Sequence, residues 1–196
     1  MARFPVVTEN SRGTGTALIV GDVQRGITEG YPFARTVVGP IAALLPRARA
    51  AGVLVVFVRI AWRLNGADVA EGNPVITALF QDPSFLEGSP GTEVDPALEV
   101  GPDDVVVLKR RASAFAGTDL DLVLRARGID SLVLTGVATG AMVTATLFDA
   151  ADRDYRITVL RDCCADADPA VHDFLVDVLF PSRGVTVTDS ASWDLG

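Results

Sequence analysis

The run SLVLTGVATG, residues 131–140, continues almost directly into MVTATLFDAADRD, residues 142–154. The first part is rich in Val and Leu, which predicts a strand buried on both faces, and the second repeats apolar residues at helical spacing. Gly136, Thr139 and Gly140 allow a tight turn between the two parts. A buried strand that turns at once into a helix is typical of parallel α/β proteins, so this stretch indicates the fold class.

Five other apolar runs of the chain have the same strand-like character. Helix-like segments lie between most of them, at residues 33–52, 118–128 and 168–180. This alternation predicts a three-layer α/β/α fold of the Rossmann-like kind, with a six-stranded, mostly parallel sheet and helices on both faces. No linker divides the chain, so we expect one domain over residues 1–196. The five runs are TALIVGD (16–22), GVLVVFVRI (52–60), DDVVVLK (103–109), YRITVLRD (155–162) and GVTVTD (184–189).

One long stretch, residues 61–101, departs from the alternation. It is rich in Gly, Pro, Asn and Asp, and only VITALF at residues 75–80 resembles a short helix. Long excursions of this kind in compact domains are commonly functional. We expect it to lie over the ligand crevice or at a subunit contact.

Composition limits the classes of partner. The chain has 196 residues, of which 49% are hydrophobic, and a formal net charge of -8. This predicts a globular protein that repels nucleic acid and anionic membrane surfaces. The uncharged stretch at 131–148 is interrupted by glycines and threonines, which disfavours a membrane span, and residues 1–13 contain no apolar run of signal-peptide length, so we do not expect export. We therefore expect a cytoplasmic protein that binds a small molecule and neither nucleic acid nor membrane.

The chain contains a single lysine, Lys109, at the end of the run at 103–109. A second run ends in the same way at Asp22. Because the carboxyl ends of parallel strands meet at one crevice where such folds bind ligands, we expect Asp22 and Lys109 to form a working pair. Taken alone, Asp22 could equally be a turn former and Lys109 part of a solvated basic patch with Arg110 and Arg111.

Three segments together resemble the isochorismatase-like hydrolases, also called the cysteine hydrolase family. The resemblance covers residues 16–180 and rests on the order and spacing of these segments. It implies a pocket in which an Asp after the first strand, a Lys after the third and a Cys after the fourth meet. Asp22 and Lys109 match the first two. The segments are DVQRG (22–26), LKRRASAFAGTDLDLVLRARGIDSLVLTGVATG (108–140) and FDAADRDYRITVLRDCCADADPAVH (148–172).

At the position of the family's nucleophilic cysteine, this chain has Met142. A thioether has no ionisable proton, so it cannot attack an amide or nitrile as a thiolate does. The resemblance leaves one branch that needs no cysteine, in which the Asp protonates a vinyl ether and water completes the hydrolysis. We therefore expect Asp22 to be the general acid and Lys109 its electrostatic partner, with a vinyl ether or an activated carbonyl as substrate. The alternative is a ligand-binding or assembly protein that has lost the nucleophile.

The resemblance also implies a cis peptide bond before Ala138, with the backbone N–H groups of Ala138 and Met142 directed at an oxyanion. It implies a homo-oligomer as well. We further expect substrate contacts from five side chains: Gln24, Arg59, Trp62, Phe115 and Thr139. Gln24 could instead orient Asp22 or be a plain loop residue, and Phe115 could be a core aromatic.

Metal ions and cofactors are not expected. Cys163 and Cys164 are adjacent and have no zinc-ligand spacing, and His172 is the only histidine. Cys163 is a weak candidate for a replacement nucleophile. His172 we interpret as a surface or packing residue.

Overall fold

The computed structural model describes residues 15–195 of the chain. In this part, six strands form one sheet in the order β3-β2-β1-β4-β5-β6, and every neighbouring pair is parallel. The six apolar runs of the sequence are these strands, so the predicted sheet is confirmed and is parallel throughout. Their bounds are β1 (Gly15–Gly21), β2 (Leu54–Ile60), β3 (Val105–Lys109), β4 (Ile129–Val137), β5 (Arg156–Ala165) and β6 (Thr186–Thr188).

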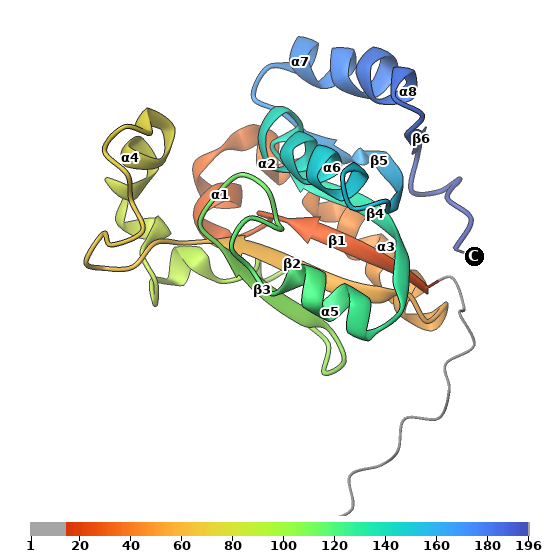
Figure 1. Cartoon of the computed structure of the whole chain (residues 1–196), viewed down its shortest axis with the longest axis horizontal. Coiled ribbons are helices and arrows are strands. Elements are labelled where there is room, and N and C mark those ends of the chain that lie inside the picture. Colours follow the sequence, from red (N-terminus) through yellow and green to blue (C-terminus); the bar gives the residue numbers. More distant parts are fainter. Residues whose placement is uncertain (1–14, 196) are drawn as a thin grey trace, which may run out of the picture.

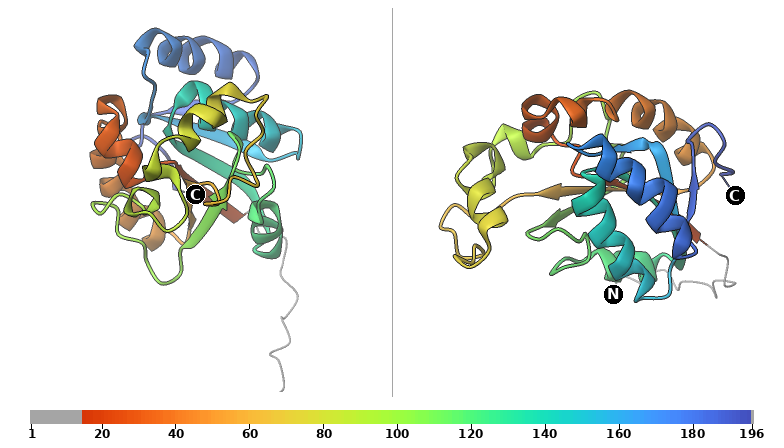
Figure 2. Two further views of the ribbon diagram at one scale, coloured as in Figure 1. Left: turned by 90° about the vertical axis from the view of Figure 1, so that its left-hand side faces the viewer. Right: turned by 90° about the horizontal axis from the view of Figure 1, so that it is seen from above.

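Helices cover both faces of the sheet, as expected (Figures 1 and 2). Successive strand residues point to opposite faces, so Ile19 packs in one core cluster and Leu18 and Val20 in the other. On the Ile19 face lie α5 (Leu120–Ala126), α6 (Thr144–Ala151), η4 (Leu175–Leu179) and α8 (Phe180–Ser182). On the Leu18 face lie α2 (Pro32–Arg35) and α3 (Val38–Ala50). Two further helices, α1 (Arg25–Gly30) and α7 (Pro169–Phe174), follow the ends of β1 and β5.

The strand order places a switch point between β1 and β4. From β1 the chain first adds β2 and β3 on one side and then crosses to add β4, β5 and β6 on the other. In open α/β sheets, ligands bind at such a switch point, beyond the carboxyl ends of the strands. Asp22 follows β1, and the turn η3 (Thr139–Val143) follows β4, so both lie at this position.

The excursion after β2 extends beyond the carboxyl ends of the strands (Figure 1). It contains α4 (Pro74–Phe80), η1 (Pro83–Phe85) and η2 (Pro90–Thr92), so the predicted short helix is confirmed. The excursion has a small apolar cluster, in which Trp62, Ile76 and Phe85 pack with Ile60 at the end of β2. Arg110 ties the excursion to the end of β3 through ion pairs with Asp68 and Glu87 and a hydrogen bond to the Ala61 carbonyl. The excursion is therefore held in place by its own packing and by Arg110, and it flanks the switch point.

None of the helices in the described residues is long and apolar enough to cross a bilayer. The amino-terminal stretch, on which the expectation of a cytoplasmic protein also depends, lies outside them.

Gly136 brings the ends of β4 and β1 together, and we expect its replacement to be severe. It has φ 113°, and a Cβ built on it would lie 2.0 Å from the carbonyl oxygen of Gly21. Backbone cannot move aside as a side chain does. Gly136→Ala should therefore lower the free energy of unfolding by more than about 4 kcal/mol, measured in urea.

Gly30→Ala is the matched control. Gly30 ends α1, and nothing lies within 4 Å of a Cβ built there. This change should stay within about 0.5 kcal/mol of the wild type. A loss below about 1 kcal/mol for Gly136→Ala would show that the close approach of the two strands is wrong.

Candidate active site

Asp22 and Lys109 meet as predicted. Asp22 is the residue after β1 and adopts a left-handed conformation with φ 57°, and its N–H donates to the Val58 carbonyl on β2. Lys109 is the last residue of β3, two strands away. Its Nζ lies 2.8 Å from Oδ2 of Asp22 and also donates to the Arg111 carbonyl at 2.9 Å. The Lys109 side chain is 1% exposed and that of Asp22 9% exposed, so this ion pair is buried.

The two carboxylate oxygens of Asp22 differ. Oδ2 accepts from Lys109, whereas Oδ1 is buried and has no hydrogen-bond partner among the described residues. Burial raises the pKa of the Asp22 carboxyl, and the charge and hydrogen bond of Lys109 oppose that rise without cancelling it. The environment therefore favours a protonated Asp22 more than water does, and Oδ1 is the free oxygen for that proton.

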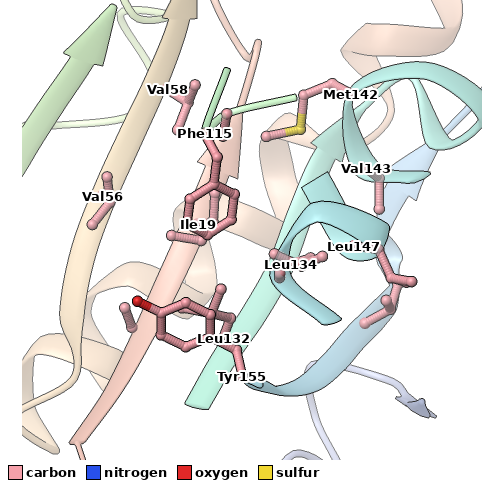
Figure 3. Packing of buried hydrophobic residues seen from close by; sticks show 14 of the residues in the cluster. Ile19, Val56, Val58, Phe115, Leu132, Leu134, Met142, Val143, Leu147 and Tyr155 are labelled. Atoms are coloured by element: carbon pink, nitrogen blue, oxygen red, sulfur yellow. The ribbon is translucent and has the colours of Figure 1, made fainter. Parts of the chain in front are cut away.

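The third part of the site is the turn between β4 and α6. The peptide bond between Val137 and Ala138 is cis, and the N–H groups of Ala141 and Val143 donate to the Ala138 carbonyl. Met142 is 2% exposed. Its Sδ and Cε lie about where a side chain on Gly21 would begin, because a Cβ built at Gly21 would be 2.2 and 2.0 Å from them. The missing side chain at Gly21 therefore makes room for Met142, which lies among the buried core side chains (Figure 3).

A cavity of about 660 Å³ joins these parts. Asp22, Lys109 and Met142 all line it, so the predicted constellation is assembled at one place. The remaining wall is largely apolar, as expected for a small-molecule site. It is formed by Ile27 of α1, Tyr31 between α1 and α2 and Phe33 of α2, by Ile60, Trp62, Asn73, Val75, Ile76, Leu79 and Phe85 of β2 and the excursion, and by Arg111, Ala112, Val137, Ala138, Ala141 and Ala167.

Of the residues predicted to contact the substrate, Trp62 lines the cavity, whereas Gln24 and Arg59 do not line it. The Gln24 side chain is fully buried and pairs with the backbone of Ile60, accepting from its N–H at 2.8 Å and donating to its carbonyl at 3.1 Å. It therefore continues the ladder between β1 and β2, and it does not orient Asp22. Arg59 precedes Ile60 on β2, so its side chain points to the opposite face, where it donates to the Thr92 carbonyl.

Phe115 and Thr139 also lie away from the cavity. Phe115 packs in the core beside Tyr155, with ring centroids 5.9 Å apart (Figure 3). Its ring belongs to the core cluster on the Ile19 face of the sheet and does not line the cavity. Thr139 is buried, and its hydroxyl shares a 2.8 Å hydrogen bond with Nδ1 of His172. The single histidine therefore supports the turn from α7 and is more than a surface residue.

Several lining residues were not predicted from the sequence. The apolar wall comes from the short helices α1, α2 and α4, whose side chains meet only in the folded chain. Arg111 was treated as part of a basic patch, yet it lines the cavity next to Lys109. The sequence did contain a signal for this position of Arg111. Arg111 follows Lys109 by two residues, so it lies in the turn that leaves the strand end at the crevice.

Neither cysteine can replace the missing thiol. Cys163 is buried, and desolvation and the nearby Asp162 raise its pKa to about 12, while burial raises that of Cys164 as well. Both therefore stay thiols at neutral pH. We expect iodoacetamide to modify neither within the time that labels a free thiol fully, as followed by intact mass, and to leave any activity unchanged. Stoichiometric labelling of Cys163 with loss of activity would contradict this.

Comparison with known proteins agrees with this geometry. The family model described as "Isochorismatase domain" matches residues 16–192. The isochorismatase family protein YecD of Escherichia coli O157:H7 is 33% identical, over 85% of this chain and 88% of its own. The maleamate amidohydrolase of Pseudomonas putida is 32% identical, over 82% and 77%. The crystal structure of a cysteine hydrolase from Pseudomonas syringae pv. phaseolicola superimposes with a TM-score of 0.84 at 30% identity, over 96% and 92%.

An all-parallel sheet with a buried Asp–Lys pair in a cavity at its switch point, together with relatives that are named as hydrolases, places the chain among the hydrolases of the α/β class. The chain belongs to the isochorismatase family, within that class.

Proposed function

We propose that this chain is a hydrolase that adds water to a small vinyl ether, with Asp22 as general acid and no covalent intermediate. The observation that carries the proposal is the Asp22 carboxyl, which is buried, has a raised pKa and keeps Oδ1 without a hydrogen-bond partner within residues 15–195. A general acid is most effective when its pKa lies near the working pH, and burial moves this carboxyl in that direction.

The proposed reaction has three steps. Asp22 gives its proton to the terminal methylene carbon of the vinyl ether, and the ether carbon becomes an oxocarbenium ion. Water then attacks that carbon and returns a proton to the Asp22 carboxylate. The hemiketal collapses with cleavage of its bond to the ether oxygen, which leaves as an alcohol, and a methyl ketone remains. The sum is vinyl ether plus water giving alcohol plus ketone.

Lys109 has two roles in this scheme. Its hydrogen bond to Oδ2 at 2.8 Å fixes the carboxyl in the cavity. Its positive charge stabilises the carboxylate that forms when Asp22 gives up its proton. Lys109 alone would lower the pKa of Asp22 and keep it ionised. The scheme therefore also needs the burial of Asp22, which raises that pKa.

Met142 supports this route over covalent amide hydrolysis. Relatives of this chain include a protein named as an amidohydrolase, but a thioether offers no thiolate. Met142 also supports the runner-up, a non-catalytic binding protein, because its side chain packs as a core residue over Gly21.

The experiment is a turnover screen in heavy water. Matched 2-alkoxyacrylates, neutral enol ethers and amides are incubated with the protein and followed by proton NMR. Protonation at carbon places one deuterium in the methyl group of the ketone product for each turnover, and amide hydrolysis places none. Enol ether turnover with one deuterium is the expected result. Hydrolysis of amides alone, or binding without turnover across the panel, would overturn the proposal.

A further inference from the structure

A cluster with excess positive charge adjoins the cavity at Arg111, which is the member of the cluster that lines it. Three arginines, Arg63, Arg110 and Arg111, gather there with two acidic residues, Asp68 and Glu87. Arg63 and Arg110 pair with Asp68 at 3.0 and 2.7 Å, and Arg110 also pairs with Glu87. Within residues 15–195, Arg111 has no carboxylate at ion-pair distance. Its charge is therefore the one that this cluster leaves uncompensated.

The guanidinium of Arg111 is held in place by neutral groups. Its NH1 donates to the carbonyl oxygens of Asp68 at 3.0 Å and of Arg110 at 2.7 Å. Its own carbonyl accepts from Lys109, which joins it to the Asp22 pair. A fixed guanidinium with further N–H groups is suited to bind a planar carboxylate, because little side-chain freedom is lost on binding.

The charges on the cavity wall favour an anion in both states of Asp22. The charged lining residues are Asp22, Lys109 and Arg111. When Asp22 is ionised it compensates Lys109, and Arg111 is left in excess. When Asp22 is protonated, both cations are in excess. An anionic ligand is thus attracted whether Asp22 is ionised or protonated.

Asn73 adds a neutral donor to the same wall. Its Oδ1 accepts from the Ile76 N–H as the cap of α4, so the two N–H bonds of its amide nitrogen remain for another acceptor. The surrounding surface from Ile76, Leu79 and Phe85 is apolar. The wall therefore combines donors for an anion with room for a hydrocarbon body.

We propose that Arg111 binds a carboxylate of the substrate, and that the substrate is a small organic acid whose apolar body lies against Ile76, Leu79 and Phe85. This inference rests on the proposed function only in taking the cavity as the active site.

The test compares benzoate with benzamide, which have the same shape and differ in charge. Calorimetric titration of the wild-type protein should show benzoate binding about tenfold more tightly. At a pH at which Asp22 is ionised and compensates Lys109, Arg111→Gln should bring benzoate to the affinity of benzamide and leave benzamide unchanged. Arg125→Gln, which removes an exposed cation on α5 outside the cavity, should change neither. Equal binding of the two probes by the wild type, or a preference that survives Arg111→Gln, would overturn the proposal.

A second measurement does not need a ligand that fits tightly. In the Met142→Cys variant, the thiol at position 142 is alkylated by the anionic reagent iodoacetate and, separately, by the neutral reagent iodoacetamide. The rate with iodoacetate is divided by the rate with iodoacetamide, and this ratio is compared with the same ratio for free cysteine. The ratio should be at least about fivefold higher in the protein and should fall toward that of free cysteine when Arg111→Gln is added, because Arg111 is the cation that no carboxylate compensates. An unchanged ratio would also overturn the proposal. Neither measurement involves turnover, so failure of the catalytic proposal is seen separately in the heavy-water screen.

Discussion

Asp22→Asn should lower the turnover of the vinyl ether found in the screen by at least about a hundredfold, since an amide has no proton to transfer. The shape of the side chain is kept, so substrate binding should change little by comparison. The measurement is single-turnover kinetics followed by proton NMR, with the folded fraction checked by circular dichroism. That check is needed because Asn leaves the Lys109 ammonium buried without its partner at 2.8 Å.

Asp130→Asn is the matched control for this experiment. Asp130 lies at the start of β4, at the opposite end of the sheet, and pairs with Arg156 on the surface. The same chemical change there should leave turnover within about twofold of the wild type, because surface pairs contribute little. Near-normal kinetics of Asp22→Asn would show that another group supplies the proton.

Met142→Cys should create an unusually reactive thiol. The side chain at position 142 lines the cavity with Lys109, and a thiolate there gains from that cation. We expect a pKa well below the ordinary value of about 8.5, and alkylation by iodoacetamide at pH 6.5 at least about tenfold faster than that of a free thiol. The pH dependence of the alkylation rate gives the pKa directly.

The wild-type protein is the control for Met142→Cys, because its two cysteines are buried and have raised pKa values. Mass spectrometry should place all rapid labelling at position 142. A thiol that titrates near 8.5 would mean that the pocket no longer activates a nucleophile. It would favour the non-catalytic alternative.

The sequence predicted the parts of the site that depend on strand ends. Each apolar run has a clear end, and parallel strands place their carboxyl ends together, so Asp22 and Lys109 could be paired although 87 positions apart in the chain. Met142 was assigned from the family resemblance, which implies a nucleophile position in the turn after the fourth strand. The sheet was predictable for the same reason, since Val-rich runs and helical spacing specify the elements directly.

Side-chain direction in loops was the part that sequence alone could not supply. Gln24, Arg59 and Phe115 are all near a strand end, and each turns away from the cavity for a local reason: a backbone ladder, strand alternation or packing in the core. The apolar wall was missed for a related reason. It is built by the short helices α1, α2 and α4, whose mutual placement depends on contacts far apart in sequence.

The ionisation of Asp22 is the most direct test of the whole account. Selective carbon-13 labelling of aspartate and an NMR titration give the pKa of this carboxyl without any substrate. Because burial outweighs Lys109, the pKa should lie above the ordinary value of about 3.9, and Lys109→Met should raise it further. Activity that needs the protonated acid should then be present below this pKa and be lost as pH rises through it. A pKa below the ordinary value would mean that Asp22 is a carboxylate at every working pH, and would contradict its role as general acid.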